Sequence, residues 1–439
     1  MTPQILPTPV GILGFGIEGQ STLQWLLSQG IKEIFVLDQK PVEVATAQVV
    51  SGANYLDGLK DCASVVRSAG VNPLLPELLK FQMNGGLVTS QVEIFMEQTQ
   101  SKCTIGVTGT LGKGTCITMI EHILKSVGVP CKIGGNYGVA ALDLLSDETP
   151  DRISLLELSS FQLMTQQRSP HVGVVLKTTS EHLDWHRSVE EYRDAKANLV
   201  RYQKPTDICV YLDDSEGSKE IAMQGRGRKL RLGHAEGCNA VIEGETMRIG
   251  SDVLNLANCV VPGVHQLENM GAAVLATWSL GVPVAKAMEA LKSYAGLTYR
   301  LEFKGVHNGI SFYNDSYATR PEAALAAAQS MKGPFALILG GSEKNGDFTE
   351  LAQVLATLKN LKSIALIGHT ATRLRTSLVS AAFSGSLEDH PTLETAFAWS
   401  CAQMQAGGSV LMSPACASFG LFANYKERGK RFDELVKAL

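Results

Sequence analysis

Residues 106–119 read GVTGTLGKGTCITM, and this composition suits a loop that binds phosphate. Three evenly spaced glycines follow an apolar run, and the last of them, Gly112, precedes Lys113. Glycines let backbone N–H groups close on phosphate oxygens at the positive end of the helix that follows. Lys113 would add a point charge for the β- and γ-phosphates. The segment therefore predicts a nucleotide site, and the alternative is a glycine-rich turn with a surface lysine.

The loop departs from the strict G-x-x-x-x-G-K-[ST] pattern at two positions. Val107 stands where the first glycine belongs, and Gly114 replaces the serine or threonine whose hydroxyl would hold Mg²⁺. Thr115 is still available to contact a phosphate, and a water could fill the missing ligand position because Mg²⁺ keeps several waters. We interpret the loop as an altered but working ATP site.

A second glycine turn lies near the N-terminus, in VGILGFGIEGQ. Gly14, Gly16 and Gly19 follow an apolar strand and precede a helical pattern, and the next strand ends at Asp38. This is the G-x-G-x-x-G fingerprint in its βαβ context. It predicts a phosphate-binding turn, or else tight packing of a helix on a strand. An NAD-dependent oxidoreductase would fit this turn, but it explains nothing about residues 106–119.

The elements that must position these loops alternate between apolar strands and helical segments along the whole chain. Such alternation predicts an α/β protein with mostly parallel sheets. We expect three domains: a Rossmann-like domain over residues 1–92, a P-loop ATPase-like domain over 93–297, and a Rossmann-like domain over 298–439. Residues 228–262 look like a short β-rich insert.

Composition narrows the class of protein. The 439 residues are 45% hydrophobic and 19% charged, and the net charge is −4 without a long basic run, which argues against a nucleic-acid partner. No apolar stretch approaches the ~20 residues of a membrane span, and no basic segment precedes the first apolar residues. The nine cysteines are scattered without a C-x-x-C pair, which predicts reduced thiols in a cytoplasmic protein.

The phosphate loop resembles the G-x-T-G-T-N-G-K-[ST]-T loop of the Mur ligases. Further segments of that family occur here in the same order: ELSSFQL (157–163), EHLDWH (181–186), RDAK (193–196), NDSYAT (314–319) and SPACASFGLFANYKERG (413–429). The first and last of these segments resemble the glutamate-adding branch. The resemblance spans all three expected domains.

The resemblance implies an ATP-dependent ligase that attaches D-glutamate to UDP-N-acetylmuramoyl-L-alanine in cytoplasmic peptidoglycan precursor synthesis. The three domains would bind the UDP-sugar, ATP and the amino acid, in that order. The substrate carboxylate would attack the γ-phosphate of ATP to form an acyl-phosphate, which the amino acid then displaces. Such phosphoryl transfer depends on positioning and charge neutralisation. The partners would be small molecules, and the protein a monomer.

The resemblance also implies which residues act on ATP and metal. Glu157, His182 and Lys196 would hold two Mg²⁺ ions, with Lys196 carbamylated by CO₂, and Arg300 would reach the γ-phosphate. Glu157 ends a strand, where its carboxylate would face the phosphate loop. The alternatives are a surface glutamate for Glu157, a structural histidine for His182 and a solvated helix lysine for Lys196. The ATP contacts would be Gly109, Thr110, Gly112, Lys113, Gly114, Thr115, Asn269, Arg300 and Asp315.

The other two substrates would use separate sets of residues. The UDP-sugar contacts would be Gly14, Gly16, Gly19, Asp38, Asn136, Ser159 and Gln162. The glutamate contacts would be Thr319, Lys344, Ser418 and Tyr425, of which Lys344 suits a side-chain carboxylate. Ordinary loop chemistry is the alternative for this second set.

Several residues depart from the family pattern around the bond-forming centre. Tyr317 replaces a lysine, Arg320 an asparagine and Lys177 another asparagine. A changed acceptor, L-glutamate, is therefore an alternative, and so is a catalytically weak protein that only binds the precursor. The second alternative is disfavoured because the scattered set of catalytic candidates is retained together.

Overall fold

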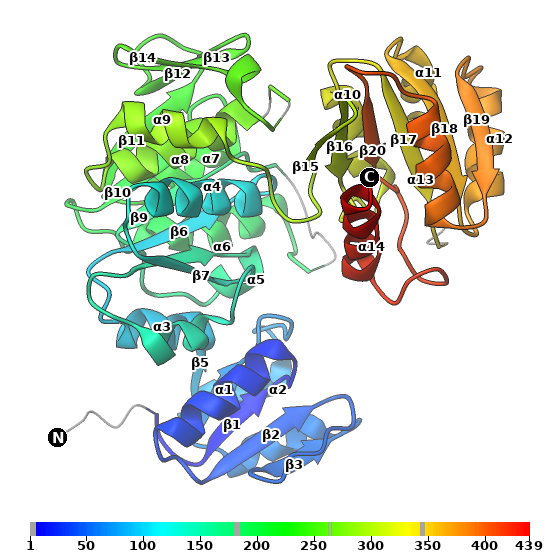
Figure 1. The fold of residues 1–439 in the computed structure, drawn as a ribbon. Coiled ribbons are helices and arrows are strands. Elements are labelled where there is room, and N and C mark those ends of the chain that lie inside the picture. Colours follow the sequence, from blue (N-terminus) through cyan, green and yellow to red (C-terminus); the bar gives the residue numbers. More distant parts are fainter. Residues whose placement is uncertain (1–5, 180–184, 262, 265, 343–346) are drawn as a thin grey trace. The chain divides into compact units, whose positions relative to one another are not determined.

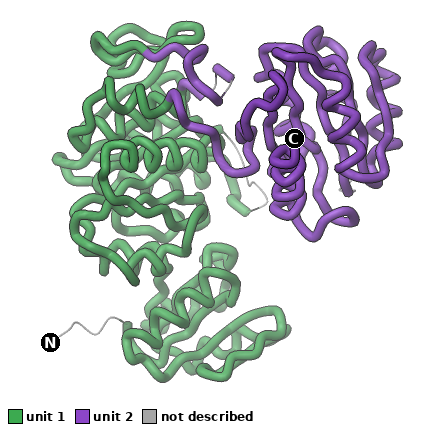
Figure 2. The backbone as a smooth tube through the Cα atoms, in the orientation of Figure 1, with its two compact units in different colours: residues 1–253, 268–291 green, residues 254–267, 292–439 purple. Residues whose placement is uncertain are grey.

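The structure is a computed structural model that describes residues 6–179, 185–261, 263–264, 266–342 and 347–439. Three β-sheets form its framework. The chain divides into two compact units, residues 1–253 with 268–291 and residues 254–267 with 292–439 (Figure 2). The first unit contains two of the sheets and the second unit contains the third (Figure 1).

The first sheet has five parallel strands in the order β3-β2-β1-β4-β5. Its strands are β1 (Val10–Leu13), β2 (Ile34–Asp38), β3 (Gln48–Ser51), β4 (Ser64–Arg67) and β5 (Leu87–Ser90). Its helices are α1 (Ile17–Ser28), the 3₁₀ segment η1 (Tyr55–Asp61), α2 (Pro76–Met83) and α3 (Gln91–Gln98). Both faces are covered, because Ile12 packs with α1 and Leu13 packs with η1 and α2.

The second sheet has nine strands in the order β14-β13-β12-β11-β10-β9-β6-β8-β7. Its strands are β6 (Thr104–Thr108), β7 (Cys131–Gly135), β8 (Ile153–Glu157), β9 (Val172–Val175), β10 (Ile208–Leu212), β11 (Arg228–Gly233), β12 (Ala240–Glu243), β13 (Thr246–Ile249) and β14 (Asp252–Asn255). The pairs from β7 to β12 are parallel, and β13 runs antiparallel to β12. The expected β-rich insert is therefore a continuation of this sheet.

Helices lie between these strands and complete the central part of the chain. They are α4 (Lys113–Ser126), η2 (Ala141–Asp147), α5 (Ser160–Leu163), α6 (Val189–Arg201), α7 (Glu216–Met223), η3 (Leu256–Asn258), α8 (Gln266–Trp278) and α9 (Val284–Lys292). The strands β6 and β8 are buried along their whole length, so the loops that follow them are held by rigid elements.

The third sheet has the order β15-β16-β20-β17-β18-β19, and only the β15–β16 pair is antiparallel. Its strands are β15 (Glu302–His307), β16 (Ile310–Asn314), β17 (Phe335–Gly340), β18 (Leu361–Ile367), β19 (Ser386–His390) and β20 (Ser409–Met412). Its helices are α10 (Pro321–Ser330), α11 (Thr349–Thr357), α12 (Ala371–Ser380), α13 (Leu393–Ala402) and α14 (Tyr425–Lys437). The first three cover one face and the last two cover the other (Figure 1).

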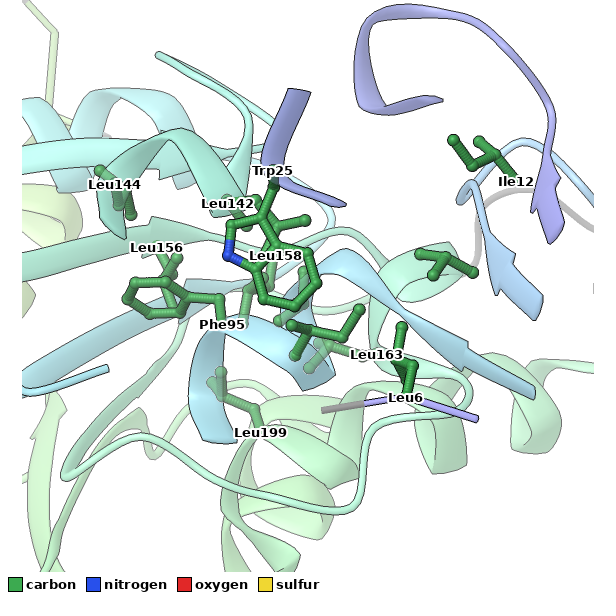
Figure 3. Close-up of a cluster of buried hydrophobic side chains, with 14 of the residues drawn as sticks. Leu6, Ile12, Trp25, Phe95, Leu142, Leu144, Leu156, Leu158, Leu163 and Leu199 are labelled. Carbon is green, nitrogen blue, oxygen red and sulfur yellow. The ribbon is translucent and has the colours of Figure 1, made fainter. Parts of the chain in front are cut away.

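One continuous apolar core joins elements of the first unit (Figure 3). Trp25 of α1 packs there with Phe95 of α3, Leu142 of η2 and Leu199 of α6. Burying side chains of this size contributes about 1.5–3 kcal/mol each. The core therefore ties the helix after the first glycine turn to the sheet that carries the phosphate loop.

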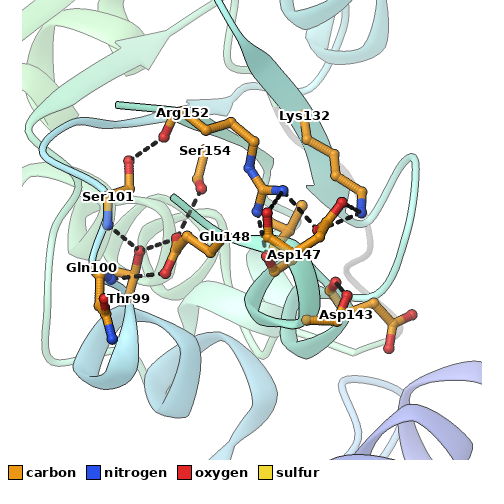
Figure 4. A network of polar contacts seen from close by, with 11 residues as sticks. Thr99, Gln100, Ser101, Lys132, Asp143, Asp147, Glu148, Arg152 and Ser154 are labelled. Carbon is orange, nitrogen blue, oxygen red and sulfur yellow. Dashed lines mark hydrogen bonds and ion pairs between the residues drawn. The ribbon is translucent and has the colours of Figure 1, made fainter. Parts of the chain in front are cut away.

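A polar network fixes the chain just before β8 (Figure 4). Arg152 Nη1 donates to Asp147 Oδ1 at 2.6 Å, and Lys132 Nζ donates to the same atom at 2.9 Å. The hydrogen bonds from Lys132 and Arg152 lower the pKa of Asp147 to about 2. Glu148 accepts from Thr99 Oγ1 at 2.5 Å. These bonds hold the strand that ends at the candidate metal ligand.

The α/β class and the mostly parallel sheets agree with the expectation from the sequence. All nine cysteines are free. Among the residues that the structure describes, no helix is long and apolar enough to cross a membrane.

Candidate active site

The glycine loop joins β6 to α4 in a conformation that requires glycine. Gly109 has φ 150° and Gly112, the residue that caps α4, has φ 83°. Side chains rarely adopt this left-handed region. A Cβ at Gly112 would also lie 2.3 Å from Asn269 Oδ1. The loop therefore presses its backbone against Asn269, which is one of the expected ATP contacts.

Two lysine ammonium groups meet at one carbonyl of this loop. Lys113 Nζ donates to Gly109 O at 2.9 Å and to Thr110 O at 3.0 Å. Lys196 Nζ donates to Gly109 O at 3.0 Å and to Thr108 Oγ1 at 3.3 Å. Both positive charges lie at the N-terminal end of α4, where the helix dipole is also positive. The arrangement favours a polyanion such as a triphosphate.

Lys196 is buried, with 1% of its surface exposed. It lies on α6. Ser188 caps the N-terminus of this helix, because its side chain accepts a hydrogen bond from Glu191 N. Its ammonium lies 4.6 Å from the centroid of the Tyr192 ring, and Tyr192 OH shares a 3.0 Å hydrogen bond with Thr110 Oγ1. We did not select Tyr192 from the sequence, although its spacing of four residues from Lys196 places both on one helix face.

Glu157 ends β8 directly beside the phosphate loop, because it pairs with Val107 of β6. Its side chain is 4% exposed, and Oε1 accepts from Asn136 Nδ2 at 2.7 Å. Among the residues that the structure describes, none forms a hydrogen bond with the buried Glu157 Oε2. A buried carboxylate oxygen of this kind costs free energy unless a cation or donor satisfies it, so Glu157 fits a divalent metal.

The structure describes only part of the remaining predicted metal set. His182 lies outside the described residues. Within the described ranges, no group of three or more His, Cys, Asp and Glu side chains could hold a metal ion. In the structure, the Lys196 ammonium donates hydrogen bonds that hold the phosphate loop.

Gly114 is buried in the first turn of α4. Its carbonyl and that of Thr115 both accept from Thr118 Oγ1, at 2.9 and 3.1 Å.

The first glycine turn combines close packing with an internal carboxylate. A Cβ at Gly19 would lie 2.3 Å from Gly14 O, so this glycine allows α1 to approach β1. Gly14 has φ 87°, while a Cβ at Gly16 would meet nothing within 4 Å. Asp38 Oδ2 accepts from Phe15 N at 2.6 Å. Asp38 thus stabilises the turn itself, and the open side of the turn lies at Gly16.

Ser159 and Gln162 form a capping box at the start of α5. Gln162 N donates to Ser159 Oγ at 3.3 Å, and Ser159 N donates to Gln162 Oε1 at 3.1 Å. Gln162 Nε2 also donates to Glu18 Oε1 at 2.9 Å. The predicted sugar contacts after β8 are therefore linked to the helix that follows the first glycine turn. Glu18 carried no signal in the sequence beyond its place in that turn.

Arg67, at the end of β4, makes a second link between the first sheet and the α5 segment. It is 1% exposed, and it donates to Val71 O at 2.6 Å, to Phe161 O at 3.1 Å and to Thr165 Oγ1 at 3.3 Å. Burial lowers the pKa of the Arg67 guanidinium to about 10. No sequence pattern marks Arg67, because a single arginine at a strand end is common.

In the second unit, Asp315 holds the segment that carries Arg300. Its Oδ1 accepts from Leu301 N at 2.9 Å and its Oδ2 accepts from Ser413 Oγ at 2.5 Å. Burial raises the pKa of Asp315 to about 7, although these hydrogen bonds and the charge of Arg300 oppose the shift. Both carboxylate oxygens of Asp315 accept hydrogen bonds from the protein itself. Asp315 therefore stabilises the backbone next to Arg300, the residue predicted to contact the γ-phosphate.

Hydrogen bonds at a buried arginine join the segments that carry three of the candidate glutamate contacts. Arg428 Nε donates to Ser316 Oγ at 3.0 Å and its Nη1 donates to Cys416 O at 3.1 Å. Ser316 Oγ donates in turn to Tyr425 O at 2.8 Å. These bonds bring together the segments that contain Thr319, Ser418 and Tyr425; Lys344 lies outside the described residues.

Lys177, one of the residues that depart from the family pattern, borders the phosphate loop, because its carbonyl accepts from Thr110 N at 2.8 Å.

A lysine-bearing glycine loop at the carboxyl ends of parallel strands defines a nucleotide-binding α/β enzyme. The family models agree. Residues 107–277 match the Mur ligase middle domain, and residues 299–416 match the Mur ligase glutamate ligase domain.

Curated relatives extend the match along the chain. A UDP-N-acetylmuramoylalanine--D-glutamate ligase of Symbiobacterium thermophilum is 31% identical over 98% of this chain and 97% of that protein. One of Acetivibrio thermocellus is 34% identical over 98% of this chain and 96% of that protein. The chain belongs to the Mur ligase family, whose members are ATP-dependent, amide-forming ligases.

Solved structures support the fold. The UDP-N-acetylmuramate-alanine ligase MurC of Thermotoga maritima has a TM-score of 0.61 at 17% identity, covering 98% of this chain and 99% of that chain. The family match includes the phosphate loop, which the NAD-dependent alternative left unexplained.

Proposed function

We propose that this ligase uses ATP to add D-glutamate to UDP-N-acetylmuramoyl-L-alanine; the names of its relatives give UDP-N-acetylmuramoylalanine and D-glutamate as the two groups that those proteins join. The observation that carries the proposal is the placement of Lys113 at the N-terminal end of α4, with Glu157 at the end of β8, the strand that pairs with β6 before the phosphate loop. A lysine cation at a helix N-terminus and a carboxylate at the end of the neighbouring strand suit transfer of a γ-phosphate.

The reaction would proceed in two balanced steps. A carboxylate oxygen of the UDP-sugar peptide attacks the γ-phosphorus, and the bond from that phosphorus to ADP breaks. The amino nitrogen of glutamate then attacks the acyl carbon, phosphate leaves, and the nitrogen gives up its proton. Lys113 and Arg300 would neutralise charge on the transferred group, whereas Asn269 would contact adenine.

We propose two Mg²⁺ ions, held by Glu157, His182 and a carbamylated Lys196. The buried, unsatisfied Glu157 Oε2 supports a cation at that position. When bound, Mg²⁺ would supply positive charge that neutralises the transferred phosphate group. Carbamylation would convert the buried Lys196 from a cation to an anion.

Carbamylation predicts a specific rescue. Lys196→Ala should lose at least about 100-fold in turnover, since it would remove a metal ligand, and acetate should restore part of the rate. In addition, ¹³CO₂ should give the wild-type protein a carbamate resonance that Lys196→Ala lacks. If acetate does not restore turnover to Lys196→Ala and the wild type shows no carbamate resonance, Lys196 is not carbamylated. Its role would then be the hydrogen bond from its ammonium to Gly109 O.

The remaining assignments are part of the same proposal. The UDP-sugar, ATP and glutamate would be bound by residues 1–92, 93–297 and 298–439, respectively. The reaction would take place in the cytoplasm, in peptidoglycan precursor synthesis, with small-molecule partners and a monomeric enzyme. L-Glutamate stays an alternative acceptor because Tyr317 and Arg320 depart from the family pattern near the proposed glutamate contacts.

The decisive experiment is phosphate release from the purified protein with ATP and UDP-N-acetylmuramoyl-L-alanine. D-Glutamate, L-glutamate or neither is added, with Mg²⁺ or with a chelator. We expect release that requires both Mg²⁺ and D-glutamate. Dependence on L-glutamate would change the assigned acceptor. No release with either acceptor, despite binding of the UDP-sugar, would indicate a precursor-binding protein.

A further inference from the structure

The Arg300 guanidinium lies over an aromatic ring. Its Cζ is 3.8 Å from the centroid of the Tyr317 ring, which is a cation–π contact. Tyr425 meets Tyr317 edge-on, with the centroids 5.1 Å apart and the planes at 90°. This edge contact fixes the orientation of the Tyr317 ring.

The backbone on both sides of Arg300 is strained. Tyr299 has φ 63° and Leu301 has φ 48°, although neither is glycine. Such conformations persist where the surroundings determine them, and they concentrate at functional sites. Here Tyr299 N donates to Glu302 Oε2 at 2.9 Å, and Leu301 N donates to Asp315 Oδ1 at 2.9 Å.

Tyr317 is tied to the same strained segment. Its backbone N donates to Tyr299 O at 2.9 Å. Its side chain is 43% exposed, so filling the core does not explain its place. A lysine, which the family resemblance leads us to expect at this position, would put a second cation beside Arg300. A tyrosine offers the guanidinium a ring face instead.

We propose that Tyr317 is a positioning residue that holds the Arg300 guanidinium in place for the γ-phosphate of ATP. The proposal rests on the proposed function for the role of Arg300, while the contact between the two side chains stands without it. A free arginine side chain has many rotamers, and stacking on a fixed ring restricts them before the nucleotide binds.

A double-mutant cycle tests this role through kcat/KM for ATP in the full-length protein. We expect Tyr317→Leu to lower kcat/KM about fivefold, as for loss of a partly exposed cation–π contact. In an Arg300→Ala background the same substitution should have no further effect, because Tyr317 acts through Arg300. Tyr317→Phe keeps the ring and should stay within about twofold of the wild type.

A matched control separates this effect from a general loss of structure. Tyr202 is similarly exposed, at 45%, and lies at the end of α6. Tyr202→Leu should leave kcat/KM unchanged, and thermal melting should be the same for all the tyrosine variants.

A measurement without turnover tests the contact alone. In protein labelled with ¹⁵N-arginine, the Arg300 Nε–Hε resonance is assigned by its loss in Arg300→Lys. Ring current should shift it upfield in the wild type and in Tyr317→Phe, and Tyr317→Leu should abolish the shift. An unshifted resonance, equal losses in the Phe and Leu variants, or additive effects in the cycle would overturn the proposal. A wild-type protein without turnover but with the shifted resonance would overturn only the proposed function.

Discussion

At the residue scale, Asp315 shows how one carboxylate can be constrained by its surroundings. It is 7% exposed, and its two oxygens accept from a backbone N–H and a serine hydroxyl. Burial penalises the charged form, and that penalty exceeds the help from the hydrogen bonds, so the pKa rises to about 7. A group near the strained Arg300 segment therefore titrates around neutral pH.

This raised pKa predicts a pH dependence of stability. The unfolded chain releases the Asp315 proton near pH 4, whereas the folded chain keeps it up to about pH 7. The associated stability is present below pH 4 and is lost as the pH rises through 7. Asp315→Asn removes this loss, so the variant should gain stability relative to the wild type between pH 5 and 7, by at most about 1.4 kcal/mol per pH unit. Urea unfolding at the two pH values measures it, and an unchanged difference between the proteins would contradict the assigned titration.

At the scale of elements, the loops after parallel strands are held by contacts that cross from one sheet to the other within the first unit. Gln162 of α5 bonds to Glu18 of α1, and Arg67 at the end of β4 bonds to the carbonyl of Phe161 in α5. The segment that carries Ser159 and Gln162 therefore depends on the first sheet for its position. Its four-residue helix is too short to be stable without such support.

Replacing the buried arginine should loosen this junction. Arg67→Met removes several charge-assisted hydrogen bonds to buried carbonyls, and we expect a loss of about 3 kcal/mol in the free energy of unfolding. The KM for the UDP-sugar should rise more than the KM for ATP. Arg168→Met is the matched control, because that side chain is 49% exposed and its ion pairs should contribute less than about 1 kcal/mol. Equal stability of the two variants would count against a bridging role for Arg67.

At the scale of the whole molecule, each ligand should stabilise the compact unit that binds it. A ligand present at 100 times its Kd adds about 2.7 kcal/mol to the free energy of unfolding. Lys113 belongs to the phosphate loop, whereas the candidate UDP-sugar contacts lie around the first glycine turn and α5. The two stabilisations should therefore be separable by mutation, even though Lys113 and the candidate UDP-sugar contacts all belong to the first unit.

Lys113→Ala tests this separation by thermal melting. We expect the variant to lose most of the shift caused by ATP with Mg²⁺, to keep the shift caused by the UDP-sugar, and to lose at least about 100-fold in turnover. Lys125→Ala is the control, since Lys125 is exposed at the other end of α4 and pairs with Glu121. Loss of both ligand shifts would mean that Lys113 supports the fold rather than the nucleotide.

The sequence by itself predicted the α/β class, the mostly parallel sheets and the glycine loop, because hydrophobic periodicity and glycine spacing are local properties. Parallel strands also bring their carboxyl ends to one edge, which made Glu157 and Lys113 candidates for one site. Only the tertiary structure revealed that Lys196 and Lys113 share the carbonyl of Gly109, and that the Arg300 guanidinium lies over the Tyr317 ring. These contacts join residues far apart in the chain or depend on side-chain packing, and no local pattern encodes them. The same reason explains why Arg67, which bonds across 94 residues to Phe161, was found only in the folded protein.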